Sequence, residues 1–349
     1  MDFEPDYQNI VDAAQNRVPR RLPLYEHLVS TGVMEKVLGV SFAHLYGGGR
    51  PDLDIFFTHY CRFFREMGYD TVSYEGCITE ILPNGGALGG GKKGAIGSWE
   101  DYRGYPWEEL EERYFALNAP RFEALRQAMP KGMKAVGGVG NGIFECVQDL
   151  VGYMDLCYLR EDELELYAQL FRKVGEVSLA IWKRFLREYG DIFCVCRFGD
   201  DLGFKSATLL DPKDIREYVI PEYRAIIEAV HQAGKPFLLH SCGCIFSVME
   251  DLIEAGIDAK HSNEDQIARF PEWVERYGDR IGNFGGIDTD AVCRLPKAEM
   301  EDYIRDVIDR CQGHGGFAFG SGNSIPDYVP VDQYLYMVNC VRRIRGENV

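Results

Sequence analysis

The sequence lacks the segments that mark membrane and secreted proteins. No stretch approaches the roughly 18 consecutive apolar residues of a membrane span. The acidic start MDFEPDYQ has neither the basic nor the apolar region of a signal peptide. Low-complexity runs, repeats of solenoid period and long Ser/Pro linkers are also missing. We therefore expect a globular protein of the cytoplasm that has no membrane partner.

Positive charge is scarce in this chain. It has 38 Lys and Arg residues against 55 Asp and Glu residues, which gives a formal net charge of −17. A field of that sign repels polyanions, so the composition argues against nucleic acid as a partner and favours a neutral or cationic ligand. The 11 cysteines are an odd number without secretory context. They argue against a disulfide framework and for buried thiols, with a metal site as a further option.

Neither glycine-rich stretch of the chain matches a phosphate-binding motif. Residues 84–94 lack the GxxxxGK[ST] order, and residues 136–142 do not keep the GxGxxG register. The first stretch is typical of a loop over an active site, and the second of a backbone that approaches a ligand closely. The first loop is flanked by aromatic side chains that we expect to line a pocket for an aromatic substrate, namely Tyr74, Tyr102, Tyr105 and Trp107.

From residue 66 onward, short β-rich segments alternate with turns and amphipathic helices. The alternation predicts an α/β fold with a parallel sheet, and the strand count predicts a single TIM-type (β/α)8 barrel. Residues 1–65 are predicted to form an N-terminal helical segment, with helices at 6–15, 22–32 and 51–67, packed on a barrel of residues 66–349 in the same domain. Strands are predicted at 71–74, 134–139, 193–197, 236–240, 259–261, 280–284 and 316–320, with an eighth in the N-terminal half.

Polar side chains follow nearly every predicted strand. In parallel barrels the loops after the strands form one face, and catalytic groups gather there. Asp200 and Asp201 are the predicted catalytic carboxylates that donate or accept a proton; the alternative is that they are solvated or cap the next helix. The predicted substrate-binding residues are Glu75, Asn141, Tyr102, Asn263 and Asn323.

The sharpest pattern is an apolar strand that runs into His240-Ser-Cys242-Gly-Cys244. An imidazole and a thiolate two residues apart can bind one zinc ion, and a catalytic zinc normally has three protein ligands and one open position. His240 and Cys242 are the predicted metal ligands, and His240 is also a predicted catalytic residue. The third ligand stays open among Cys244, Cys77, Glu75, Asp201 and the 321–323 turn. The alternative is a metal-free site in which His240 is a general acid or base and both cysteines are structural.

The chain resembles the uroporphyrinogen decarboxylase superfamily, and within it the corrinoid-dependent methyltransferase branch of O-demethylase and methylcobamide:thiol type. The similar stretches are 17–19, 200–203, 221–231, 240–243, 279–288 and 320–326. The resemblance implies a zinc ion held by a His-x-Cys pair and a later Cys. His240 and Cys242 match the first two ligands, whereas Asn323 stands where those methyltransferases usually have the Cys.

That resemblance implies a methyltransferase that moves a methyl group from a small methylated donor to a cobalt corrinoid on a corrinoid-binding partner protein. Aryl methyl ethers are the favoured donors, because an acidic site tolerates neutral aromatics and the tyrosine-rich loop would stack on them. Three alternatives stay open: methyl transfer from the corrinoid to a thiol, a metal-free lyase of the uroporphyrinogen decarboxylase type that uses Asp200, and a non-catalytic corrinoid-binding scaffold. The arginine pattern expected of those decarboxylases is missing, which disfavours a polyanionic porphyrinogen.

Overall fold

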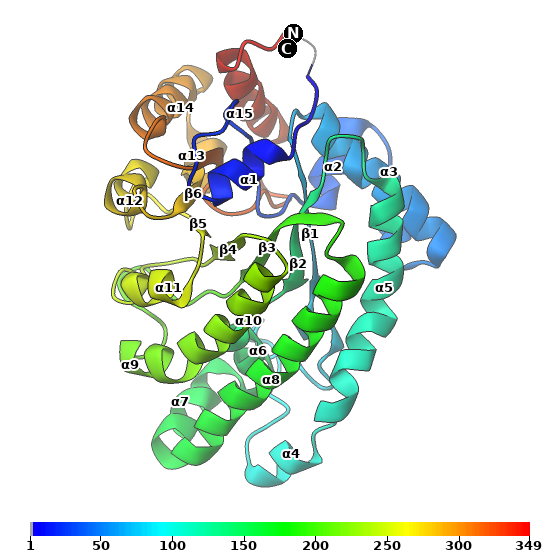
Figure 1. Ribbon diagram of the computed structural model, residues 1–349, viewed down its shortest axis with the longest axis vertical. Coiled ribbons are helices and arrows are strands. Elements are labelled where there is room, and N and C mark those ends of the chain that lie inside the picture. Colours follow the sequence, from blue (N-terminus) through cyan, green and yellow to red (C-terminus); the bar gives the residue numbers. More distant parts are fainter. Residues whose placement is uncertain (1–2) are drawn as a thin grey trace.

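The computed structural model describes residues 3–349 and is built around one parallel sheet (Figure 1). Its seven strands are hydrogen-bonded in chain order from β1 to β7. Their bounds are β1 Val72–Cys77, β2 Ala135–Gly140, β3 Phe193–Gly199, β4 Phe237–His240, β5 Ala259–His261, β6 Gly282–Ile287 and β7 Phe317–Ser321. The seven strands predicted from the sequence are confirmed, with ends that shift by up to three residues.

The sheet curls around a small apolar core of its own. Inward-facing side chains from β2 to β7 meet in one cluster, which helix α1 (Gln8–Ala14) and Tyr25 complete. A larger core lies between the outside of the strands and the surrounding helices. Leu238 of β4 belongs to the inner core and Leu239 to the outer one, as the two-residue period of a strand requires.

Within the described residues the predicted eight-stranded barrel is only partly present, because β7 and β1 do not pair with each other. An extended segment from the N-terminal region lies beside β7 instead. Leu24 and Val29 form parallel bridges with Phe319 and Ile325 of the β7 region. The segment thus occupies the edge of the sheet where an eighth strand would lie.

The helix predicted at residues 22–32 is therefore wrong. Pro23 disfavours a helix because it has no backbone N–H to donate. The N–H of Tyr25 donates to the carbonyl of Phe319 at 2.8 Å, and the N–H of Phe319 donates to the carbonyl of Pro23 at 2.9 Å. Pairing with a strand almost 300 residues away overrides the apolar spacing that had suggested a helix.

Arg197 of β3 ties this extended segment to the sheet from inside. Its guanidinium is fully buried and donates to Glu75 of β1 at 2.6 and 3.2 Å. The same group donates to the hydroxyl of Tyr25 and to the carbonyl of His27, both at 2.9 Å. One side chain therefore joins β1, β3 and the N-terminal segment across the gap in the sheet.

Helices cover the outside of the curled sheet (Figure 1). The helix α8 (Leu164–Tyr189) shows why, because its buried side chains recur at helical spacing and face the strands. They include Leu170, Val174, Ile181 and Phe185. The other helices are α2 Thr31–Leu38, α3 Arg50–Glu66, α4 Trp99–Gly104, α5 Leu110–Ala128, α6 Ile143–Val151, α7 Tyr153–Asp162, α8 Leu164–Tyr189, α9 Pro212–Asp214, α10 Ile220–Gln232, α11 Met249–Ala255, α12 Phe270–Tyr277, α13 Thr289–Arg294, α14 Lys297–Cys311 and α15 Val331–Ile344, with single turns at Ala43–Gly47, Ile78–Ile81, Trp107–Glu109 and Ile215–Val219. No helix within residues 3–349 is both long and apolar enough to cross a membrane.

Helix α1 closes the amino-terminal end of the curled sheet. A Cβ on Gly316, just before β7, would lie 1.9 Å from the carbonyl oxygen of Ala13, and a Cβ on Gly282 of β6 would lie 2.2 Å from it. Both positions therefore require glycine. With this end covered, the opposite end, where the strands finish, is the one that carries polar side chains.

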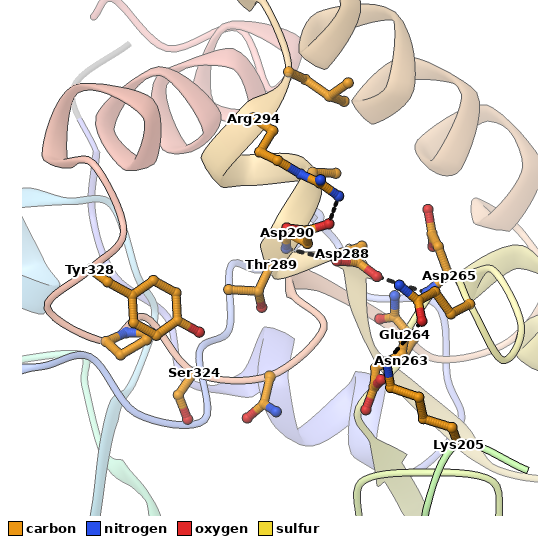
Figure 2. A pocket seen from close by; sticks show the side chains of 15 residues that line it. Lys205, Asn263, Glu264, Asp265, Asp288, Thr289, Asp290, Arg294, Ser324 and Tyr328 are labelled. Carbon is orange, nitrogen blue, oxygen red and sulfur yellow. Dashed lines mark hydrogen bonds and ion pairs between the residues drawn. The ribbon is translucent and has the colours of Figure 1, made fainter.

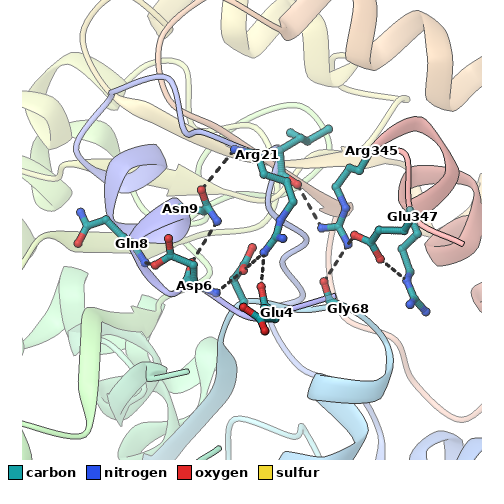
Figure 3. A network of polar contacts seen from close by, with 11 residues as sticks. Glu4, Asp6, Gln8, Asn9, Arg21, Gly68, Arg345 and Glu347 are labelled. Carbon is teal, nitrogen blue, oxygen red and sulfur yellow. Dashed lines mark hydrogen bonds and ion pairs between the residues drawn. The ribbon is translucent and has the colours of Figure 1, made fainter. Parts of the chain in front are cut away.

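The two ends of the chain are anchored near the start of β1 (Figure 3). Arg21 pairs with the buried Asp70 and donates to the carbonyl of Glu4 at 3.1 Å. Arg345, which follows α15, donates to the carbonyl of Gly68 at 3.0 Å and pairs with Glu347. These contacts fix the N-terminal segment and the last helix to the same turn, residues 68–70, between α3 and β1.

One buried lysine lies on the outer side of β5. Lys260 is 3% exposed, and its Nζ lies 3.7 Å from the centre of the Trp273 ring and donates to the carbonyl of Ser262. Burial lowers its pKa from 10.5 to about 7. A charged ammonium is therefore poorly accommodated in the folded protein.

We expect Lys260→Met to remove a pH-dependent part of the stability. Between pH 7 and pH 10.5 the unfolded chain binds a proton at Lys260 that the folded protein does not, so the stability of the native protein rises with pH, by at most about 1.4 kcal/mol per pH unit. From pH 7 to pH 9 the native protein should therefore gain about 2 kcal/mol relative to the variant. Urea unfolding of both proteins at the two pH values measures this; parallel pH profiles would contradict it.

Candidate active site

Three of the predicted site residues converge at the ends of β3 and β4. His240 ends β4 and is buried, and its Nε2 lies 3.5 Å from the Sγ of Cys242 and 3.8 Å from an oxygen of Asp201. The backbone N–H of Cys242 donates to that same oxygen at 2.9 Å. The possible ligand atoms of these three residues all lie within 4.8 Å of one another.

This donor set fits a zinc ion. Zinc bonds of about 2.0–2.3 Å in tetrahedral geometry place neighbouring ligand atoms about 3.3–3.6 Å apart. The distances of 3.5 and 3.8 Å in this site are close to that spacing. Imidazole, thiolate and carboxylate are all common zinc ligands. Of the candidates for the third ligand, the structure brings Asp201 to the pair, and the side chain of Asn323 contacts Cys242 by donating to its Sγ at 3.3 Å.

A second group of potential ligands, His27, His240 and His261, is arranged for other contacts. The rings of His27 and His240 stack with centroids 3.7 Å apart and planes 10° apart. Lone pairs of stacked imidazoles lie in parallel planes and do not converge on one ion. The Nδ1 atoms of His240 and His261 are 2.7 Å apart, which is the distance of a hydrogen bond. We therefore take His27 and His261 as residues that support His240 by stacking and by a hydrogen bond.

Burial keeps the imidazoles neutral. Burial holds the pKa of His27 and the pKa of His240 well below the ordinary value. The charge of Arg197 lowers the pKa of His27 further, and the neighbouring His261 does the same for His240. Burial also lowers the pKa of His261 to about 3 and, together with the charge of Asp201, raises the pKa of the Cys242 thiol. Zinc binding would therefore release a proton from Cys242.

The neighbouring carboxylates Asp200 and Asp201 have different surroundings. Asp200 is fully buried and accepts hydrogen bonds from the backbone N–H groups of Phe144 and Glu145, at 2.9 and 2.8 Å, and from the hydroxyl of Tyr223 at 2.5 Å. It thus holds the first turn of α6 in the manner of a helix cap. The side chain of Asp201 is 44% exposed and faces His240.

Glu145 is a candidate that the sequence analysis missed. It lies in the first turn of α6, where one carboxyl oxygen accepts from the Nδ2 of Asn141 at 2.8 Å and the other from the N–H of Asp201 at 3.3 Å. Burial, with the charges of Asp200 and Asp201, raises its pKa well above the ordinary value. Burial thus favours the protonated form of Glu145, whose carboxyl group contacts the backbone of Asp201. Its position after the turn at the end of β2 is the sequence signal that would have indicated it.

Two cavities are lined by predicted site residues, and neither lining includes Asp201, His240 or Cys242. The larger, of about 1030 Å³, is lined by the predicted residues Asn263 and Asn323 and by several acidic side chains. Figure 2 shows Asp265, Asp288 and Asp290 on one side of it and Tyr328 on the other. The smaller cavity, of about 430 Å³, reaches the predicted residue Glu75. It is more aromatic, and the aromatic residues that line it are Tyr46, Phe56, Tyr60 and Tyr74.

The remaining predicted substrate-binding residues have structural contacts. Asn141 accepts from the hydroxyl of Thr79 at 2.8 Å and donates to Glu145. The hydroxyl of Tyr102 accepts from the Nε2 of Gln169 in α8 at 2.9 Å, and Tyr102 lines neither cavity. Of the four aromatic residues around the first glycine-rich loop, only Tyr74 lines one of these cavities.

Comparison with known proteins gives the family. The model of the uroporphyrinogen decarboxylase (URO-D) family matches residues 100–344, which is more than half of the chain. The chain therefore belongs to the uroporphyrinogen decarboxylase family.

Individual relatives are distant. Uroporphyrinogen decarboxylase of Pelobacter propionicus is 27% identical over 136 residues, 39% of each chain, and that of Syntrophotalea carbinolica is 25% identical over 187 residues. The second alignment covers 52% of this chain and 49% of the relative, so the similarity spans half or less of these curated relatives. A methyltransferase from Methanosarcina mazei has a similar fold, with a TM-score of 0.76 over 98% of this chain and 99% of its own, at 15% identity.

The different surroundings of the two aspartates predict different effects of mutation. Asp200→Ala should lower the free energy of unfolding by about 2–3 kcal/mol, because it removes a helix cap and leaves the buried hydroxyl of Tyr223 without an acceptor. Asp201→Ala, the matched control at the neighbouring position, should change it by less than about 1 kcal/mol in the metal-free protein. Urea unfolding after chelator treatment measures both, and equal losses would contradict the assignment.

Proposed function

We propose that this protein is a cytoplasmic methyltransferase that takes a methyl group from a small methylated donor and passes it to a cobalt corrinoid on a partner protein. The observation that carries the proposal is the convergence of Asp201, His240 and Cys242 at the strand ends, where Asn323 of the larger cavity contacts Cys242. The family and the similarity in fold to a methyltransferase support it. We further propose that the fold works as a (β/α)8 barrel, with residues 24–29 in the eighth strand position and the N-terminal helices in the same domain.

We assign the zinc ligands to His240, Cys242 and Asp201. Zinc bound there would supply a Lewis acid that weakens the bond between the methyl group and its oxygen. The residues of the chain do the rest. Neutral His240 would bind the ion through its Nε2, and Asp201 and the deprotonated Cys242 would bring two negative charges to it. Glu145, whose burial favours the protonated form, would supply a proton. In this reaction the carbon–oxygen bond breaks and its electron pair stays on the oxygen. The methyl group bonds to the reduced cobalt, which supplies the electron pair, and Glu145 protonates the released oxygen.

An aryl methyl ether is the proposed donor. The aromatic cavity beside Glu75 is large enough for one ring and is walled by Tyr46, Phe56 and Tyr74. Aromatic walls stack favourably on a ring, and the hydroxyl groups of Tyr46 and Tyr74, 3.0 Å apart, offer hydrogen bonds to its substituents. This cavity replaces the loop around Tyr102 as the place for the donor.

The decarboxylase activity named for the relatives is the second candidate. Its support is the family itself. A porphyrinogen with many carboxylates needs a cationic pocket, whereas Glu264, Asp265, Asp288 and Asp290 line the larger cavity against only Lys205 and Arg294. We therefore place decarboxylation below methyl transfer.

Metal analysis tests the proposed site. The purified native protein should contain about one zinc per chain, and Cys242→Ser should contain almost none. Cys244→Ser is the matched control, because this thiol is two residues away and lies outside the three converging ligands. Equal zinc contents in the two variants would refute the assignment of Cys242.

A spectroscopic assay tests the reaction. Native protein mixed with reduced corrinoid and methoxylated aromatics should convert the cobalt from its reduced to its methylated absorption spectrum, and methylamines or methanol should do so poorly. Glu145→Gln should slow the reaction by about 100-fold or more, because a positioned acid contributes about 10²–10⁴-fold. Methylation with none of the donors, together with carbon dioxide release from a porphyrinogen, would favour the decarboxylase.

A further inference from the structure

The end of β5 carries three consecutive buried residues to which the proposed reaction gives no role. These are Lys260, His261 and Ser262. His261 contacts the zinc ligand His240, and the hydroxyl of Ser262 donates to the zinc ligand Cys242 at 3.6 Å. Two adjacent residues at the end of β5 thus contact the two proposed zinc ligands at the end of β4.

The contacts of His261 determine which nitrogen of His240 carries the proton. The Nε2 of His261 lies 3.1 Å from the carbonyl oxygen of Ser321, and a carbonyl only accepts, so this nitrogen carries a proton. A doubly protonated imidazole would be costly here, because His261 is fully buried and its ring nitrogens contact only His240 and Ser321. His261 therefore accepts at Nδ1, and His240 donates from its Nδ1. The Nε2 of His240 is left as a bare lone pair that faces Cys242 and Asp201.

Ser262 has a backbone conformation that serine rarely adopts. Its φ of +108° lies in the region that favours glycine, and such a conformation persists only where the surroundings enforce it. The Nζ of Lys260 donates to the carbonyl of Ser262 and lies over the ring of Trp273. In this conformation the hydroxyl of Ser262 and the amide of Asn323 both donate to the sulfur of Cys242.

We infer that Lys260, His261 and Ser262 form a positioning unit that prepares His240 and Cys242 for zinc before the ion arrives. His261 selects the tautomer of His240 that binds through Nε2. Ser262, held by Lys260, orients the sulfur of Cys242. The inference rests on the zinc site of the proposed function and adds residues that touch neither zinc nor substrate.

The first experiment measures zinc affinity of the full chain by competition with a chromophoric chelator. His261→Phe should weaken zinc binding by about 10- to 100-fold, the usual effect of losing a hydrogen-bond partner of a ligand. His261→Asn, whose side-chain oxygen can accept from the Nδ1 of His240, should recover part of the affinity. His231→Asn is the matched control, because His231 pairs with Asp258 away from the site and its loss should leave zinc affinity unchanged.

A nitrogen-15 NMR spectrum of the zinc-free protein provides a readout that does not depend on the metal. In the native protein His240 should show its proton on Nδ1, and in His261→Phe the two tautomers should mix. A single unchanged tautomer in His261→Phe would overturn the role of His261.

Ser262→Gly separates positioning from ordinary structural support. Glycine adopts a φ of +108° without strain, so the variant should unfold at a higher urea concentration than the native protein. It should nevertheless bind zinc several-fold more weakly, because the hydroxyl that orients Cys242 is gone. Native zinc affinity in both Ser262→Gly and His261→Phe would refute the inference and leave the proposed function intact. A native protein that binds no zinc would overturn both.

Discussion

The buried guanidinium of Arg197 is the interaction on which the rest of the architecture depends. A desolvated charge is costly unless every donor has a partner, and the partners of Arg197 come from β1 and from the N-terminal segment. The contacts with Tyr25 and His27 hold that segment in the gap between β7 and β1. His27 in turn stacks on His240. The closure of the sheet and the position of the candidate zinc ligand His240 therefore both depend on the side chain of Arg197.

The same strand geometry explains why adjacent residues differ so strongly. Successive side chains near a strand end point to opposite sides, so Asp200 turns towards the first turn of α6 and Asp201 towards the open end of the sheet. Similarly, His261 faces the inside of the sheet while Lys260 faces Trp273 outside. A run of polar residues at a strand end therefore divides into residues that build the fold and residues that line the site.

The sequence was sufficient for the strands, and it singled out His240 and Cys242, which the structure brings together with Asp201. Apolar runs such as 236–240 are local signals, and the spacing of His240 and Cys242 already indicates a shared ion. The extended course of residues 24–29 was not predictable in this way, because its partners Phe319 and Ile325 lie almost 300 residues away. The capping role of Asp200 and the relevance of Glu145 and His261 depend on which way side chains point across neighbouring strands. Single-sequence patterns do not carry that information.

The proposed ligand set bears on the direction of the proposed methyl transfer. In the resembled methyltransferases a histidine and two cysteines hold zinc, and here Asp201 lies where a third ligand is needed while Asn323 only donates to Cys242. One thiolate and one carboxylate neutralise a divalent ion as completely as two thiolates do. A carboxylate is the harder ligand and gives less electron density to the metal, so the ion keeps more of its affinity for hard oxygen. Such a site suits the oxygen of a methyl ether better than the soft sulfur of a thiol, and this favours demethylation of an ether over methylation of a thiol.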